Sequence, residues 1–370
     1  MKINKFLTIF AIKLIFTACG TQNEYYNLAS AHDHHNNHGH IHDHSHNHDH
    51  SEFEFLIEGT EGYINIYSSR HFLADEEIFR RFTEATGIGI NVIFAHGGQV
   101  VERLRIEGES TQSDLIISDD GGILSNAKSH GLIMPVSSAL LEANVPAQLR
   151  DRDNYWFALS YRARVLAMLE PNLFKNYNDL AADGVNVLLR PGNHLYNISL
   201  LASIIDIYGH DVALSWANSI NNNRARNPQG NDRDQMSALV AGLGDVAMVN
   251  NYYLGLLLNS SNPEEVQVGE SIYIVFPNQD TSGTHINISG MAVPLHSTNV
   301  EGAIAFMEFM TSEEIQTFLS HENYEFPVNI NATAHPMLEG HLPFLKQDID
   351  FTVLYKNHIQ AIEIINIVGW

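Results

Sequence analysis

Residues 62–370 are predicted to form an α/β protein, and three observations support this class. Short apolar runs alternate with amphipathic helical stretches from Gly62 onward, which is typical of βα units with largely parallel sheets. The chain has 370 residues, of which 44% are apolar, so it is long enough for two domains or one large two-lobed one. No internal repeat is evident.

The predicted elements follow one another in a regular order. Residues 63–69 (YINIYSS) read as a strand and residues 75–87 as a helix, with Ile78, Phe82 and Ala85 on one face and Gly87 as its stop. Three further apolar runs are predicted to be buried strands. They are residues 113–119 (SDLIISD), 186–190 (NVLLR) and 245–249 (DVAMV), and a helical stretch such as 197–209 follows each turn.

The charge of the chain excludes one class of partner. Forty-three acidic residues against 20 basic ones give a formal charge of −23 at pH 7. Such a chain repels phosphate backbones, and it has no basic stripe for nucleic acid. Cations are therefore the partners that we expect it to attract.

The first 18 residues are predicted to be an export signal, because two lysines precede an apolar run and the chain's only cysteine. Cys19 in "TACG" then reads as a lipidation site, which would explain a single cysteine in an exported protein. The alternatives are an ordinary cleaved signal or a short membrane anchor. We expect an exported lipoprotein of the cell envelope, in the periplasm or on the outer face of the cytoplasmic membrane.

Residues 19–61 are predicted to be a histidine-rich disordered linker that carries the lipid anchor. Neutral imidazole is a common ligand of zinc, copper and nickel, so the linker is expected to bind Zn²⁺, Ni²⁺ or Cu²⁺ loosely. A solvated spacer that binds metal only incidentally is an equal alternative. The histidines concerned are His32, His34, His35, His38, His40, His42, His44, His46, His48 and His50.

Three predicted loops place hydroxyl or imidazole groups directly after strands: residues 65–72, 188–199 and 249–255. In open α/β sheets, ligands bind outside the carboxyl ends of the strands, so these loops are expected to meet at one cleft. The adjacent Tyr252 and Tyr253 need an explanation, because neighbouring side chains diverge in regular structure. We expect irregular backbone at the strand exit to turn both rings inward. His194, His96 and Tyr67 are interpreted as packed or solvated residues.

The residue types at these loops indicate the kind of ion. Ionising a phenol at pH 7 costs about 4 kcal/mol, so only a strongly polarising cation offsets three phenolates. Ca²⁺ and Mg²⁺ prefer carboxylates and Zn²⁺ prefers sulfur and imidazole, whereas ferric iron suits phenolate oxygen. The sequence has no G-x-S-x-G, Walker or H-E-x-x-H motif, so no enzyme activity is expected.

The chain from Gly62 to Trp370 resembles the ferric-ion-binding solute-binding proteins of bacterial ABC transporters. The segments that carry the resemblance are YSSRH, ATGI, RARV, LRPGNHLYNIS, NPQGND, GDVAMVNNYYLG, GTHINISG, FPVN and the terminal GW. It implies a type II periplasmic-binding-protein fold, similar to a transferrin lobe, with two α/β lobes and crossing strands near residues 159–169 and 283–293. The implied first lobe spans 62–161 and 284–335, and the second spans 162–283 and 336–370.

The resemblance also implies a ligand set. In the matching branch, iron is held by a His-Tyr pair and three further tyrosines, which here correspond to His71, Phe72, Tyr196, Tyr252 and Tyr253. Phe72 has no oxygen to offer, so four protein ligands remain, and water, carbonate or another small anion would complete the coordination. Arg70 and Arg190 would balance phenolate or anion charge, with a surface or interlobe salt bridge as the alternative.

The implied function is a monomeric ferric carrier that closes around Fe³⁺ and delivers it to an ABC permease and its ATPase. Two alternatives come from the same residues. Phe72 is compatible with a same-fold carrier of a divalent metal or a small organic anion. The histidine tract is compatible with a surface metal-storage or adhesion lipoprotein.

Overall fold

The computed structural model describes residues 53–70 and 72–370. The predicted export signal, Cys19, the histidine tract and His71 lie outside the described residues, so the predictions about them remain predictions. Within the described ranges, no helix is both long and apolar enough to cross a membrane.

The strands form one mixed sheet in the order β1-β3-β2-β4-β10-β6-β8-β7, while β5, β9 and β11 pair with its two central strands. Neighbours are parallel at β2–β3, β2–β4 and β7–β8 and antiparallel elsewhere. The prediction of largely parallel sheets was therefore only partly right. The strands are β1 (Phe53–Ile57), β2 (Tyr63–Ser68), β3 (Gly89–Phe94), β4 (Leu115–Ser118), β5 (Ile133–Met134), β6 (Phe157–Met168), β7 (Val187–Leu188), β8 (Val246–Asn250), β9 (Tyr273–Val275), β10 (Ile286–Pro294) and β11 (Phe326–Pro327).

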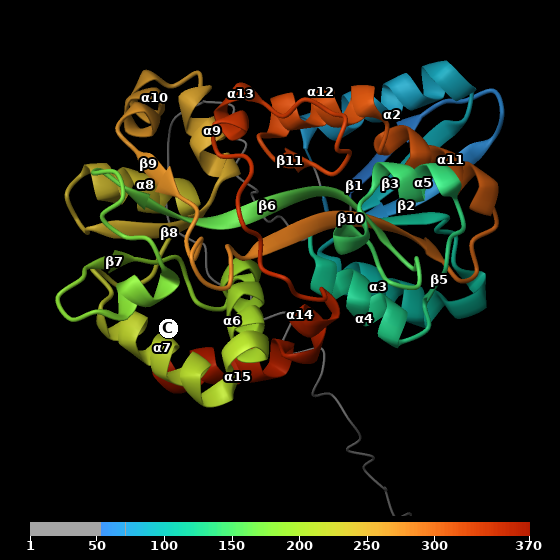
Figure 1. Ribbon diagram of the computed structural model, residues 1–370. Helices are drawn as coiled ribbons and strands as arrows, with labels where there is room; N and C mark the ends of the chain where they lie inside the picture. Colours follow the sequence, from blue (N-terminus) through green and yellow to red (C-terminus); the bar gives the residue numbers. More distant parts are fainter. Residues whose placement is uncertain (1–52, 71) are drawn as a thin grey trace, which may run out of the picture. The chain divides into compact units, whose positions relative to one another are not determined.

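Helices cover the sheet on both sides of its centre (Figure 1). They are α2 (Leu73–Thr86), α3 (Gly97–Glu107), α4 (Gly121–Ser129), α5 (Ala139–Asn144), α6 (Leu195–Tyr208), α7 (His210–Asn222), α8 (Asp232–Val240), α9 (Tyr252–Leu258), α10 (Pro263–Glu270), α11 (Val300–Met310), α12 (Glu313–Asn323), α13 (Pro336–Glu339), α14 (Thr352–Lys356) and α15 (His358–Val368), with 3-10 turns η2 (Gly108–Ser110), η3 (Ala147–Leu149) and η4 (Tyr177–Ala181).

The two central strands, β6 and β10, connect the two lobes of the fold. They are antiparallel neighbours, and every residue of both is buried. Figure 1 shows them running across the middle of the molecule, with β1–β5 on one side and β7–β9 on the other. They coincide with the crossings expected near residues 159–169 and 283–293.

The first lobe contains β1–β5, α2–α5, α11 and α12. Strand β1 pairs antiparallel with β3, so the prediction of a disordered linker up to residue 61 was wrong for residues 53–57. Local sequence explains the helices of this lobe. Helix α2 ends at Gly87, whose left-handed backbone (φ 75°) lets its N–H donate to the carbonyl of Thr83. Ile78 and Phe82 of this helix are buried as predicted, whereas Ala85 in its last turn is exposed. Asp120 is the N-cap of helix α4, and its carboxylate accepts from two backbone N–H groups of the first turn.

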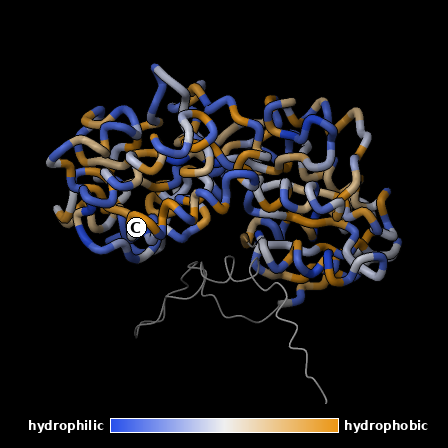
Figure 2. The backbone as a smooth tube through the Cα atoms, turned by 90° about the horizontal axis from the view of Figure 1, so that it is seen from below, coloured by the Kyte–Doolittle hydropathy of each residue, from blue (hydrophilic) through white to orange (hydrophobic). Residues whose placement is uncertain are grey.

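The second lobe contains β7–β9, α6–α10 and α15. Helices α6 and α7 pack against α15, and α8 packs against β8. The chain returns here from the first lobe through α13 and α14, and α14 contacts both α4 and α6. Figure 2 shows hydrophobic and hydrophilic segments alternating along the backbone of both lobes, as expected when each element turns one face to a core.

Candidate metal centre

The adjacent tyrosines lie where β8 ends and α9 begins. Their rings stack with centroids 4.3 Å apart, and Tyr252 is buried whereas Tyr253 is partly buried. The strand exit was predicted, but the backbone there is helical rather than irregular. Asn251 fixes the junction, because its Oδ1 accepts from the N–H of Ala163 in β6 at 2.7 Å.

Tyr196 lies in the first turn of α6 and reaches the same place from the predicted loop 188–199. Its hydroxyl is 2.9 Å from the hydroxyl of Tyr252. His194 precedes it as the N-cap, and its Nδ1 accepts from the backbone N–H of Tyr196 at 3.3 Å. Two of the predicted phenolic ligands therefore share a hydrogen bond.

These two tyrosines face a pocket with an empty volume of about 330 Å³. Both lobes contribute to its wall, and Phe72 lies in it, so the structure brings Phe72 together with Tyr196 and Tyr252. Tyr253 stacks behind Tyr252 and is not part of the wall. The lining residues are Ser69, Arg70, Phe72, Asp119, Arg162, Tyr196, Tyr252, Ser289 and Glu325.

Arg70 is fully buried and paired with carboxylates of its own lobe. Its guanidinium lies 3.1 Å from Asp75 and 2.7 Å from Glu325. It also lies 4.3 Å from the centroid of the Phe72 ring. Arg70 thus forms a buried salt bridge within its own lobe, rather than the surface or interlobe salt bridge of the alternative prediction, and it also stands beside the pocket.

Arg190 lies behind Tyr196 rather than in the pocket wall. It shares the buried carboxylate of Asp232 with Arg164, at 3.1 and 2.7 Å. Its guanidinium carbon is 5.1 Å from the centroid of the Tyr196 ring, and that of Arg164 is 5.9 Å away. A salt bridge and proximity to a candidate ligand therefore occur together here as well.

Arg162 is a site residue that the sequence reasoning missed. It is 3% exposed, lines the pocket, and its guanidinium carbon is 5.2 Å from the centroid of the Tyr196 ring. It donates to the backbone carbonyl of Asp119 at 2.6 Å, and no described carboxylate lies within ion-pair distance of it. The signal for it was RARV in a predicted crossing strand, because residues two apart share one face of a strand.

Burial controls the protonation of the tyrosines. It raises the pKa of both Tyr196 and Tyr252 above the usual phenol value, the neighbouring phenols add to this, and Arg162 opposes it. Both phenols are therefore protonated at neutral pH in the metal-free protein. In the part of the chain described, no group of three or more His, Cys, Asp or Glu side chains is placed to hold a metal ion.

Comparison with known proteins gives consistent matches. The family of bacterial extracellular solute-binding proteins matches residues 68–317. Iron uptake protein A1 of Synechocystis sp. is 36% identical over 318 residues, which cover 84% of this chain and 88% of the relative.

Two solved structures are similar to the chain over most of its length. One is Trichodesmium IdiA (FutA) in complex with iron and citrate ligands, with a TM-score of 0.79, 37% identity and coverage of 84% of this chain and 100% of that one. The other is a ferric binding protein from Campylobacter jejuni, with a TM-score of 0.77, 42% identity and coverage of 83% and 99%. These matches confirm the predicted two-lobed α/β fold.

Proposed function

Because the chain belongs to the family of bacterial extracellular solute-binding proteins, we propose that it binds ferric iron between its lobes and delivers it to an ABC importer. The relatives are solute-binding proteins, so this chain is a carrier rather than an enzyme. The observation that carries the proposal is the pair of buried phenols, Tyr196 and Tyr252, whose oxygens lie 2.9 Å apart in a pocket shared by both lobes.

The proposed ligands are the phenolates of Tyr196, Tyr252 and Tyr253 and the imidazole of His71. Three phenolates carry the charge that neutralises one Fe³⁺, which a trivalent ion in a buried site requires. Water, carbonate or another small anion would occupy the remaining positions. Arg162, Arg70 and Arg190 would balance the charge of the phenolates or of that anion.

Closure of the lobes would present the loaded carrier to the permease and its ATPase. Iron with ligands from both lobes favours the closed form, because the ion binds that form more tightly than the open one. The proposed lobes are 62–161 with 284–335 and 162–283 with 336–370. We propose that the carrier is a monomer and that a lipid on Cys19 anchors it in the cell envelope.

The test is a visible spectrum and an iron analysis of protein that lacks residues 31–50. One Fe³⁺ per chain with a phenolate-to-iron charge-transfer band is the expected result. Iron-loaded protein without such a band, or no uptake of Fe³⁺ at all, would reject tyrosine ligation. Zn²⁺, Mn²⁺ and citrate alone serve as competing cargoes in the same titration.

Deleting residues 31–50 is expected to remove loose binding of nickel and zinc and to leave ferric affinity within about twofold. The reason is that imidazole clusters and phenolate oxygens prefer different ions. Calorimetric titration of both forms with each metal checks this. A large loss of ferric affinity on deletion would show that the tract takes part in the cleft site.

Replacing Phe72 with tyrosine is expected to raise ferric affinity by at least about tenfold and to strengthen the visible band. The new phenol would lie in the same pocket as Tyr196 and Tyr252, and the Arg70 guanidinium, 4.3 Å from the ring centroid, would favour its ionised form. Ionisation costs about 4 kcal/mol at neutral pH, but the phenolate displaces a neutral water or a loosely held anion from a trivalent ion.

The matched control is Phe318→Tyr in α12, because Phe318 is also partly buried and lies 4.2 Å from an arginine guanidinium, that of Arg81. This variant should leave ferric affinity unchanged. If Phe72 only forms an apolar part of the pocket wall, the hydroxyl added in Phe72→Tyr has no hydrogen-bond partner. Its burial then lowers the folding stability by about 1 to 3 kcal/mol. Unchanged affinity together with a lower melting temperature of the metal-free Phe72→Tyr protein would therefore contradict the prediction.

A further inference from the structure

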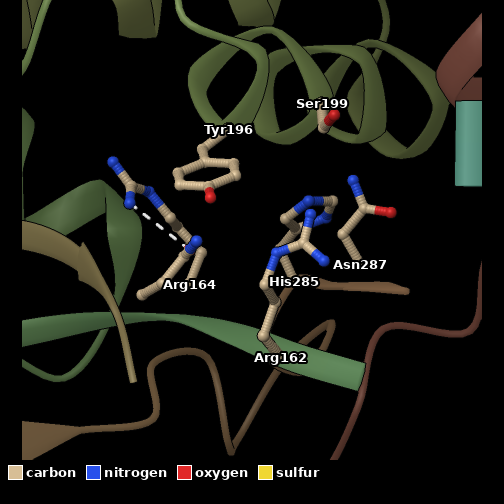
Figure 3. A pocket seen from close by; sticks show the side chains of 7 residues that line it. Arg162, Arg164, Tyr196, Ser199, His285 and Asn287 are labelled. Carbon is tan, nitrogen blue, oxygen red and sulfur yellow. Dashed lines mark hydrogen bonds between the residues drawn. The ribbon is translucent and has the colours of Figure 1, made fainter. Parts of the chain in front are cut away.

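A second cavity lies behind the Tyr196 ring, between the crossing strands β6 and β10, helix α6 and the end of β8. It shares only Arg162 and Tyr196 with the wall of the candidate metal centre. Figure 3 shows the guanidinium groups of Arg162 and Arg164 on either side of the space beneath the Tyr196 ring. The lining residues are Arg162, Arg164, Tyr196, Ser199, Asn250, His285 and Asn287.

Three side chains in this wall each have a buried nitrogen without a hydrogen-bond partner. They are Nε of Arg162, Nε of Arg164 and Nδ2 of Asn250, and the three residues are 3%, 2% and 3% exposed. The Oδ1 atom of Asn250 accepts a hydrogen bond from Arg164 at 3.4 Å, which orients the amide. Its Nδ2 atom is therefore the one without a hydrogen-bond partner. Buried donors are nearly always satisfied, so three around one cavity call for an acceptor.

The charges around the cavity call for an anion rather than a neutral acceptor. Three guanidinium groups surround the Tyr196 ring, and Asp232 is the one described carboxylate that forms ion pairs with them. Arg162 has no such pair. The carboxylates that act on it from a longer distance, Glu325, Asp119 and Asp120, all lie outside the cavity wall.

The other polar groups in the wall leave this excess positive charge in place. Burial, together with the nearby Arg164 and Arg162, lowers the pKa of His285 to about 3, so the ring is neutral. The hydroxyl of Ser199 and the amide of Asn287 both donate to Asp120, a carboxylate outside the wall. No group of the wall supplies negative charge.

We propose that this cavity binds one monovalent anion of halide size, with chloride as its natural occupant, in the metal-free protein. The space is small, so it suits one monatomic anion better than the larger carbonate, phosphate or carboxylate ions. Guanidinium and amide N–H groups supply the hydrogen bonds, and Arg162 supplies the countercharge. The inference does not depend on the proposed iron function, because it concerns the metal-free protein and neither Phe72 nor Tyr252 lines this cavity.

The first test is diffraction from crystals of the metal-free full chain grown in bromide. An anomalous bromide peak between Arg162, Arg164 and Asn250 is expected. In solution, replacing sodium gluconate by sodium chloride at about 0.5 M and constant ionic strength should raise the melting temperature of the metal-free protein by at least about 2 °C. Absence of the bromide peak would mean that the cavity holds water only, and the proposal would fail.

A pair of variants separates site binding from a general salt effect. Ser199→Val replaces the hydroxyl with a methyl group and adds a second methyl group at the cavity wall, so the chloride-specific shift should disappear. Ser203→Val is the matched control, because Ser203 is a buried serine one turn later in α6, bonded to the carbonyl of Leu200, and not part of the wall. The proposal would be overturned if chloride raised the melting temperatures of the two variants equally. It would also be overturned if chloride raised the melting temperature of the parent protein no more than gluconate does.

Discussion

Replacing Tyr252 with phenylalanine is expected to weaken ferric binding by more than about a hundredfold. Loss of a residue that only supports a ligand costs about 10- to 100-fold, and Tyr252 is proposed to be a ligand itself. The change also leaves the Tyr196 hydroxyl without the partner that lies 2.9 Å away. Tyr196→Phe should have a similar effect, and both should weaken the charge-transfer band. Competition with a chelator of known ferric affinity measures the loss.

Tyr161→Phe is the matched control, since it removes a hydroxyl from a tyrosine that is also buried but lies outside the cleft. Tyr161 is 5% exposed in β6, its ring stacks on Phe326, and Lys346 Nζ is 3.5 Å from its hydroxyl. Ferric affinity of this variant should stay within about twofold of the parent. If Tyr252→Phe and Tyr196→Phe bind iron as tightly as Tyr161→Phe does, neither phenol is a ligand.

The meeting of Tyr196 and Tyr252 could be predicted because it follows from strand order and local spacing. Strands β7 and β8 are parallel neighbours, so the loops after residues 188 and 250 leave the same edge of the sheet. Each tyrosine then lies in the first turn of the following helix, α6 or α9. Because each tyrosine follows its strand closely in the sequence, the order of the two strands was enough to predict that the two hydroxyls meet.

The direction of the central strands could not be predicted from their sequence. A strand buried on both faces has the same continuous apolar pattern whether its neighbours are parallel or antiparallel. All 12 residues of β6 are buried, so nothing in its pattern showed that it pairs antiparallel with β8 and β10. The sheet was therefore predicted to be more parallel than it is.

Arg162 was missed for a related reason. An arginine within an apolar strand reads as a local interruption, and its role depends on which groups from other parts of the chain surround it. Its neighbours here are Tyr196 from α6 and the Asp119 carbonyl from the end of β4. Only the fold shows that this cation faces two phenols and has no described carboxylate as partner.

The number of protons released per iron connects the buried phenols to function. Burial raises the pKa of Tyr196 and Tyr252, so both are protonated in the metal-free protein across the physiological range. A phenol must lose its proton to become a phenolate ligand, and metal binding therefore releases protons. At least two protons per Fe³⁺ are therefore expected at neutral pH, one each from Tyr196 and Tyr252, and one more in Phe72→Tyr.

Ferric affinity should consequently fall at least about a hundredfold for each unit by which the pH is lowered below the pKa values of Tyr196 and Tyr252, because two protons compete with one ion. The sign follows from the raised pKa values: the protonated form belongs to the metal-free state, so acid favours release and base favours binding. Calorimetry in buffers of different ionisation enthalpy counts the protons directly, and competition with a chelator at several pH values gives the slope. A count of two or more in the parent that falls by about one in Tyr252→Phe would identify the Tyr252 phenol as a source. A count of zero, or full loading near pH 4, would show that the iron is held without the phenolates of Tyr196 and Tyr252.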